Sequence, residues 1–233
     1  MNPHAEPRLL LLETSGRIGQ VAVAEGPAIL ATRRLEEGRR HARDLAPAVA
    51  GLLGEHSWNP ADVDAVVVSR GPGSYTGLRV GIMSAKAFAY ATGCALLAVD
   101  TFAAVALQTP AEATSVDVIA DAQQEKVYVQ SFARATDAHW RPVSALAIVQ
   151  LVAWLAGRDA AAWLSGPGVH AYQHRMPSGH HLVSTAHREP HVESLLQLVL
   201  PRFCAGERDD LFGLEPLYLR PSSAEEKWQS QTS

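Results

Sequence analysis

The sequence is poor in cysteine and has no long apolar run. Its 233 residues include only Cys94 and Cys204, which fit neither a CxxC motif nor a Cys/His metal pattern. We therefore expect two reduced core residues and no disulfide framework. No stretch approaches the roughly 18 apolar residues that a membrane helix needs. Because the first residues also lack the basic and apolar regions of a secretory signal peptide, we expect a cytoplasmic protein with no membrane contact.

Positive charge is not in excess. Lys and Arg number 20 against 24 Asp and Glu, which gives a net charge of −4. Because affinity for a phosphate backbone comes mainly from clustered Lys and Arg, this balance argues against a stand-alone RNA-binding domain. The hydrophobic fraction of 47% and the charged fraction of 19% are ordinary for a globular protein. A chain of this length makes one large or two small domains.

Several catalytic motifs are missing from the glycine-rich turn at residues 71–77. A nucleotide-binding P-loop needs a lysine and then a hydroxyl residue after its last glycine, whereas Leu78 and Arg79 follow here. The glycine spacing also misses the GxGxxG dinucleotide fingerprint by one residue, and Ser74 is not framed as a GxSxG nucleophile. The turn therefore keeps the backbone freedom of glycine without catalytic side chains.

The same turn is flanked by a strand and a helix. Residues 64–69 form a β-branched run that is typical of a buried parallel strand, and Ser74 or Thr76 can cap a helix over residues 77–92. Small side chains recur every four residues along this helix, and larger apolar ones lie beside them. These positions are Gly77, Gly81, Ala85, Ala89, Leu78 and Ile82. The stripe would let another backbone approach closely, although an ordinary core helix of an α/β domain has the same spacing.

Several long segments occur in the same order in one known family. The longest of these segments is SRGPGSYTGLRVGIMSAKAFAYATG, at residues 69–93. After Cys94 comes a second one, ALLAVDTFAAVA, at residues 95–106. Further similar segments are LLLLETS at 9–15, RRHARDLAPAVAGLL at 39–53, DAQQEKVYVQSF at 121–132 and PLYLR at 216–220. By these segments the chain resembles the TsaB family, also called YeaZ, of the bacterial tRNA threonylcarbamoyladenosine machinery. Residues 133–189 show the least similarity.

The resemblance implies an α/β fold with two lobes, of the actin-like or Hsp70-like ATPase (ASKHA) type. Such a fold is a duplicated β-β-β-α-β-α-β unit, and here the second lobe looks abbreviated. We expect a first lobe over residues 1–101 that carries partner-binding helices, a smaller second lobe over 102–221, and a flexible tail over 222–233. The last helix and the PLYLR segment are expected to pack back on the first lobe.

The pattern of apolar residues agrees with such a duplication. Three short apolar runs at the start read as a β-meander, and the strand pattern returns after residue 115. The expected elements of the second lobe are strands at 116–120, 126–132 and 160–164, a helix at 143–155, and a glycine turn at 165–168 that echoes the turn of the first lobe. The final helix is expected over 192–203.

The resemblance also implies a function and a set of partners. By this resemblance, the chain would be a non-catalytic dimerisation subunit that activates the catalytic subunit TsaD. The product of the complex would be N6-threonylcarbamoyladenosine at position 37 of tRNAs that read codons beginning with A. The chain would be no enzyme by itself and would hold no cofactor of its own, because ATP or ADP and a metal belong to the partner subunits. Expected partners are a TsaD homologue and the ATPase TsaE, with tRNA reached only through the complex and a homodimer possible alone.

Two positions suggest that catalytic groups have been lost. Actin-like ATPases place an aspartate at the end of the first strand, where this chain has Glu13. The longer side chain fits a subunit without hydrolysis. The alternative is that Glu13 is simply the solvated end of a strand. The catalytic relative carries two histidines four residues apart, whereas His41 is followed at that spacing by Leu45. A single histidine is more often a cap or surface group than a metal ligand.

We expect the partner interface on the two helices at residues 39–56 and 77–92, with pairing through residues 44–53 and 77–91. Together they would form a four-helix contact with the homologous subunit. The residues expected there are His41, Leu45, Val49, Leu52, Gly77, Leu78, Gly81, Ile82, Ala85 and Ala89. By their charge and position alone, Arg79 and Lys86 are candidates for a nucleotide site shared at the subunit junction.

Alternative functions remain open at this point. An autonomous ATPase, sugar kinase or metallopeptidase of the same fold would need an aspartate-bearing phosphate loop or an intact metal pair, and the sequence supplies neither. The pairs His170 and His174, and His187 and His191, have a four-residue spacing that could serve a metal. Neither pair lies in an HExxH frame and Pro190 interrupts the second, so metal binding is not favoured.

Overall fold

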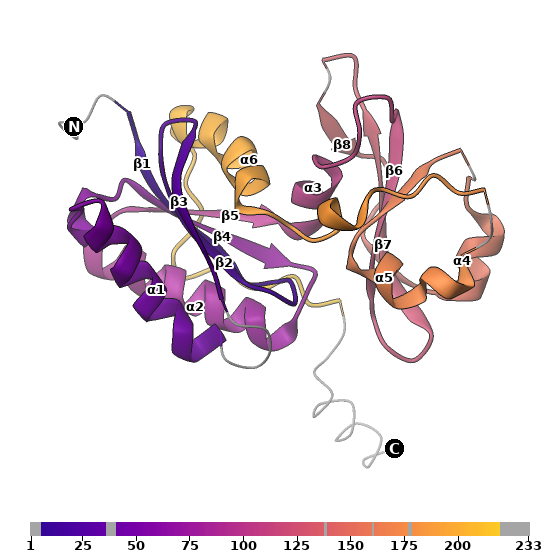
Figure 1. Ribbon diagram of the computed structural model, residues 1–233, viewed down its shortest axis with the longest axis horizontal. Helices are drawn as coiled ribbons and strands as arrows, with labels where there is room; N and C mark the ends of the chain where they lie inside the picture. The colour runs from indigo at the N-terminus through magenta and orange to yellow at the C-terminus, as the bar shows by residue number, and fades with distance from the viewer. Residues whose placement is uncertain (1–5, 36–40, 138, 160, 177–178, 220–233) are drawn as a thin grey trace, which may run out of the picture.

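The computed structural model contains two β-sheets that lie side by side, each with helices packed on it (Figure 1). The structure describes residues 6–35, 41–137, 139–159, 161–176 and 179–219. The first sheet has the strand order β3-β2-β1-β4-β5, and the second has the order β10-β6-β7-β8 with β9 also paired to β7. The expected two-lobed α/β architecture is confirmed.

The first lobe follows the predicted order of three strands, a helix, a strand, a helix and a strand. Its strands are β1 (Arg8–Glu13), β2 (Gln20–Glu25), β3 (Ala28–Arg34), β4 (Ala65–Gly71) and β5 (Ala95–Asp100). Its helices are α1 (His41–Glu55), the short 3-10 helix η1 (Pro60–Asp62) and α2 (Tyr75–Thr92). The first three strands are antiparallel, and β4 and β5 extend the sheet in parallel.

The first sheet is buried on both faces, which explains the continuous apolar runs of β1 and β4. Leu10 and Leu12 belong to the core beneath α1 and α2. Leu9 and Leu11 belong to the opposite core, beneath α6 (Val192–Cys204). Figure 1 shows α1 and α2 on one side of this sheet and α6 on the other. The alternation of strand side chains therefore divides β1 between two cores.

Helix α2 has the start and the end that the sequence predicts. Ser74 is the N-cap and accepts a hydrogen bond from the backbone N–H of Gly77 at 3.2 Å, so Ser74 and not Thr76 caps the helix. Gly93 closes it in the left-handed conformation, with φ of 76°. A Cβ at Gly77 would stand 2.0 Å from the backbone oxygen of Thr14. The backbone that approaches the small stripe thus belongs to this same chain, at the residue that directly follows β1.

The second lobe is a shorter version of the first. Its elements are α3 (Thr101–Ala106), β6 (Ser115–Asp121), β7 (Lys126–Arg134), β8 (Trp140–Pro142), β9 (Ala147–Gln150), α4 (Leu151–Gly157), β10 (Trp163–Ser165), α5 (Pro167–Tyr172) and the 3-10 helices η2 (Gln173–Arg175) and η3 (Thr185–His187). β6 pairs with β7 antiparallel and with β10 in parallel, as β1 does with β2 and β4. Within the described residues, no further strand follows α5 as β5 follows α2. This repetition confirms the abbreviated duplication.

Two local predictions are wrong. The helix expected over residues 143–155 begins only at Leu151, because residues 147–150 form β9 and pair with β7. The apolar pattern there fits either structure, and a partner strand distant in sequence decides it. The expectation of two core cysteines also fails, since Cys204 is exposed and Cys94 is half-buried, although both are free thiols.

The chain returns to the first lobe at its C-terminal end. Helix α6 packs on β1, β4 and β5, and Leu214 belongs to the core beneath α1 and α2. Leu217 donates its backbone N–H to Arg70 O at 2.8 Å. Residues 222–233, expected to form a tail, lie outside the described part of the chain. In the part that is described, no helix is long and apolar enough to cross a membrane.

Replacing Gly77 with alanine should destabilise the fold, because the new methyl group would strike the buried backbone of Thr14. We expect Gly77→Ala to lower the free energy of unfolding by about 2 to 3 kcal/mol. The control is Gly51→Ala within α1, where an added Cβ meets nothing within 4 Å and should stabilise by up to about 1 kcal/mol. Urea unfolding checks both values, and equal stability of the two variants would contradict this account of α2 packing.

Candidate functional site

The end of β1 lies against the turn that leads into α2. We call Glu13, Thr14, Ser15 and the turn at residues 71–77 the strand-end site. Glu13 has no exposed surface. Its Oε1 accepts hydrogen bonds from Ser15 N at 2.6 Å, Ser15 Oγ at 2.5 Å and Gly16 N at 3.2 Å. The interpretation of Glu13 as a solvated strand end is therefore wrong.

Burial changes the ionisation of Glu13. Desolvation raises the pKa of its carboxyl group to about 7, against the opposing effect of the hydrogen bonds from Ser15 and Gly16 and of the nearby Ser69 hydroxyl. Glu13 Oε2 and Ser69 Oγ are both buried, and each lacks a hydrogen-bond partner of acceptable geometry among the described residues. A carboxyl group in such surroundings is protonated more readily than an ordinary glutamate, so Glu13 carries only part of its negative charge near pH 7.

The strand-end site is closed by its own backbone. Ser74 donates its N–H to Ser15 O at 2.8 Å, and Thr14 Oγ1 donates to Gly77 O at 2.8 Å. A Cβ at Gly73 would lie 2.6 Å from Ser15 O, so this turn and the end of β1 are in direct contact. Backbone N–H groups at the first turn of a helix can hold phosphate. Here Thr14 and Ser15 fill the space at the first turn of α2.

The residues predicted for the partner interface are buried within the chain. Leu52 has no exposed surface, Leu45 is 2% exposed, and Val49 packs against the same core. The α2 positions predicted for the interface are also buried: Gly77, Leu78, Gly81, Ile82, Ala85 and Ala89. The side chain of His41 lies outside the described part. The apolar periodicity of the sequence predicted one apolar stripe on α1 and one on α2. Both stripes pack against this chain's own first sheet and not against a partner.

The opposite faces of α1 and α2 are exposed, and no sequence pattern pointed to them. Met83 is 64% exposed and Tyr90 is 74% exposed on α2, and Ala87 lies exposed between them. On α1 the exposed positions are Arg43, Ala46, Pro47, Ala50, Gly51, Gly54 and Glu55. We call this set the helix-pair surface. The signal that could have located it is the presence of large apolar residues off the buried stripe.

Arg79 and Lys86 bind the chain's own C-terminal segment. Arg79 Nε donates to the Tyr218 hydroxyl at 3.0 Å, and its guanidinium lies 4.2 Å from the centre of the Tyr75 ring. The rings of Tyr75 and Tyr218 stack with centroids 4.9 Å apart. Lys86 Nζ donates to Phe212 O at 2.9 Å. Both cations therefore fasten residues 212–218 along the edge of α2.

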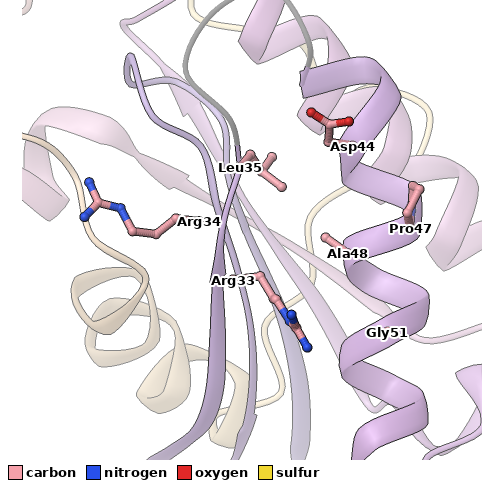
Figure 2. A pocket seen from close by; sticks show the side chains of 7 residues that line it. All are labelled: Arg33, Arg34, Leu35, Asp44, Pro47, Ala48 and Gly51. Atoms are coloured by element: carbon pink, nitrogen blue, oxygen red, sulfur yellow. The ribbon is translucent and has the colours of Figure 1, made fainter.

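A hollow of about 350 Å³ lies between the end of β3 and α1. Figure 2 shows Asp44, Pro47 and Ala48 on the helix side and Leu35 facing them. Its lining residues are Arg33, Arg34, Leu35, Asp44, Pro47, Ala48 and Gly51. The volume of this hollow is at the lower end of the range for small-molecule sites. One of its lining residues, Arg33, forms an ion pair with Glu55.

Histidine pairs do not form a metal centre in the described residues, where no group of three or more His, Cys, Asp and Glu side chains could hold an ion. The rings of His187 and His191 are 6.1 Å apart and tilted by 50°. His170 and His174 belong to α5 and η2.

The two lobes, each built on the same strand order, define an actin-like ATPase fold. The family model that describes TsaD, tRNA N6-adenosine threonylcarbamoyltransferase, matches residues 34–153, just over half of the chain. YeaZ from Pseudomonas aeruginosa has a solved structure that matches with a TM-score of 0.78 and 30% identity, covering 91% of this chain and all of that one. The chain therefore belongs to the TsaB (YeaZ) family, and it matches the TsaD family model.

Two curated relatives extend the comparison. The tRNA threonylcarbamoyladenosine biosynthesis protein TsaB of Bacillus subtilis is 24% identical over 94% of this chain and 97% of its own length. An uncharacterised protein of Mycobacterium tuberculosis is 38% identical over 43% of this chain. That match spans about half, 46%, of the mycobacterial protein.

The buried carboxyl group of Glu13 should make stability depend on pH. The folded state holds the Glu13 proton with a pKa of about 7, and the unfolded state releases it near 4.5. The stabilisation is therefore fully present below pH 4.5 and is lost as the pH rises through 7, by about 3 kcal/mol in all. Urea unfolding at several pH values should show this fall in the wild type relative to Glu13→Gln, which keeps the shape without the charge. Parallel pH profiles of the two proteins would contradict it.

Proposed function

We propose that this protein is a non-catalytic dimerisation subunit in the formation of N6-threonylcarbamoyladenosine at position 37 of tRNA. In this proposal it activates a homologous catalytic subunit of the TsaD type. The observation that carries the proposal is the helix-pair surface, which offers exposed apolar side chains from two adjacent helices. The names of its TsaB and YeaZ relatives support the pathway.

The composition of the helix-pair surface supports docking by another pair of helices. Met83 and Tyr90 stand out from α2, whereas the exposed α1 positions between Arg43 and Glu55 are small residues and one proline. Large side chains on one helix and small ones on its neighbour allow helices of a partner to pack closely and interdigitate. Aromatic residues and methionine are enriched in the buried centres of protein interfaces.

The arrangement of the lobes supports the same reading. In Figure 1, α1 and α2 line the outer side of the first lobe, and the second lobe lies beside the sheet rather than over these helices. No second-lobe element is among the main contacts of either helix in the described residues. A partner can therefore approach both helices without moving the second lobe.

The strand-end site supports a role without catalysis. An autonomous ATPase or sugar kinase would need phosphate-binding N–H groups and an aspartate at the end of β1. Here the chain's own oxygens accept those N–H groups, and Glu13 is buried beneath them. In the proposed assembly ATP or ADP and the metal therefore belong to the partner subunits, including the ATPase TsaE, and tRNA is reached through the complex in the cytoplasm.

Changing Met83 or Tyr90 to glutamate should break the complex without unfolding the chain. Both side chains are largely exposed, so each variant should keep its stability, but a charge buried at an interface costs enough to weaken binding by about tenfold or more. The control is Val152→Glu in the second lobe, since Val152 is 63% exposed and Met83 64%. Co-purification and titration with the TsaD homologue provide the measurement.

If Met83→Glu and Tyr90→Glu both bind the TsaD homologue as tightly as Val152→Glu does, the helix-pair surface is not the docking site. Sedimentation of the chain alone separates pairing with itself from pairing with the catalytic subunit. Depletion of the protein from cells tests the pathway separately. Threonylcarbamoyladenosine should disappear from tRNA while the catalytic subunit stays abundant, and its persistence would refute the proposed function.

A further inference from the structure

Phe212 is the most exposed of the large apolar side chains in the described part of the chain, at 78%. It lies in a turn at residues 210–214, in the segment that follows α6. Leu214 ends the turn and is buried in the core beneath α1 and α2. A single exposed apolar residue is ordinary, but this ring is held in place and has exposed apolar neighbours.

Three hydrogen bonds hold the turn at residues 210–214 in one shape. The Phe212 N–H donates to Asp210 Oδ1 at 2.9 Å, and the Leu214 N–H donates to Asp210 O at 3.0 Å. From α2, Lys86 Nζ donates to Phe212 O at 2.9 Å. The ring is therefore presented on a backbone that is already fixed, so little backbone entropy is lost when a partner covers it. Aromatic residues are enriched in the buried centres of protein interfaces.

The turn adjoins the helix-pair surface. Lys86, which holds the turn, comes three residues after Met83 and four before Tyr90, so all three side chains project from one side of α2. Most of the exposed large apolar side chains in the described residues lie on α2 or in the C-terminal segment. They are Met83, Tyr90, Phe212, Tyr218 and Leu219. Apolar exposure is therefore concentrated along this edge of the first lobe, and Phe212 extends it beyond the two helices.

The opposite border of the helix-pair surface has a complementary shape and charge. The hollow beside β3 has Pro47 and Ala48 on its helix side and two arginines in its lining (Figure 2). Phe212 has acidic neighbours in the sequence, the exposed Asp210 and Glu215. When two homologous helix pairs dock across a two-fold axis, the border beside α2 of one meets the border beside α1 of the other. The ring at one border and a hollow at the other therefore face each other in such a pairing.

We propose that Phe212 is an anchor residue for the catalytic subunit, and that it enters an apolar hollow with a basic rim on that subunit. This inference rests on the proposed function, because it assumes that a TsaD-type partner docks at the helix-pair surface. The TsaD family model matches residues 34–153, a range that includes α1 and nearly all residues that line the hollow. The match ends before the turn at residues 210–214. In the proposed pairing this chain supplies the ring and its homologous partner supplies the hollow.

Shortening the Phe212 side chain should weaken the complex without unfolding the chain. We expect Phe212→Ala to raise the Kd for the TsaD homologue by about tenfold or more, mainly through faster dissociation, and Phe212→Leu to lose less because it stays apolar. The control is Val143→Ala in the second lobe, which shortens a side chain that is 64% exposed. Surface plasmon resonance gives both rate constants, and thermal melting checks that each variant is folded.

A second change tests the basic rim of the partner's hollow. Glu215→Lys places a positive charge near Phe212, so it should slow association at low salt by about tenfold. The control is Glu193→Lys, an exposed position on α6, on the other side of the first sheet. Equal association rates for these two variants would refute the basic rim.

The outcomes separate the role of Phe212 from the proposed function. If Phe212→Ala binds the TsaD homologue as tightly as Val143→Ala does, while Met83→Glu or Tyr90→Glu binds weakly, Phe212 is not an anchor and the docking surface stands. If Phe212→Ala, Met83→Glu and Tyr90→Glu all bind normally, both proposals are refuted. The role of Phe212 is equally refuted if Phe212→Ala changes only the pairing of this chain with itself, measured by sedimentation.

Discussion

The contact between the end of β1 and the small side chains of α2 is the constraint on which the rest of the first lobe depends. Thr14 lies against Gly77 and Gly81 so closely that a methyl group at either glycine would overlap it, at 2.0 and 2.1 Å. The glycine at position 81 lowers the intrinsic stability of the helix by about 1 kcal/mol, and close packing on the sheet offsets this loss. The contact holds the buried face of α2 on the sheet, which leaves Met83 and Tyr90 exposed on the other.

The same contact closes the strand-end site. A phosphate held at the start of α2 would need a gap between the end of β1 and the turn at residues 71–77, because it must reach backbone N–H groups there. In this chain Ser15 O accepts the N–H of Ser74, and Glu13 accepts those of Ser15 and Gly16. These contacts hold α2 in one position on β1. The outer face of α2 therefore keeps a fixed position on the first lobe. One packing arrangement therefore both closes the strand-end site and holds the outer face of α2 in place.

Local signals were enough to predict much of the fold, and contacts distant in sequence account for what was missed. The cap at Ser74, the closing Gly93 and the meander depend on neighbouring residues, and they were found. Residues 147–150 became a strand because β7 lies beside them. The burial of Glu13 depends on elements that come later in the chain, and its neighbours in sequence give no sign of it. The apolar stripe of α2 was located correctly, but periodicity cannot tell whether a sheet or a partner covers it.

The contacts of Arg79 and Lys86 with the C-terminal segment limit where a partner can bind on α2. Their charge and position suggested a nucleotide, yet they hold Tyr218 and Phe212 O of the C-terminal segment. This segment therefore forms one border of the helix-pair surface, along the edge of α2. On the far side of α1 the border is the hollow beside β3 (Figure 2). Nearby, Arg33 pairs with Glu55. Charged groups thus flank an apolar centre, which is the usual plan of a protein interface, and the proposed partner must place its own apolar helices between these two borders.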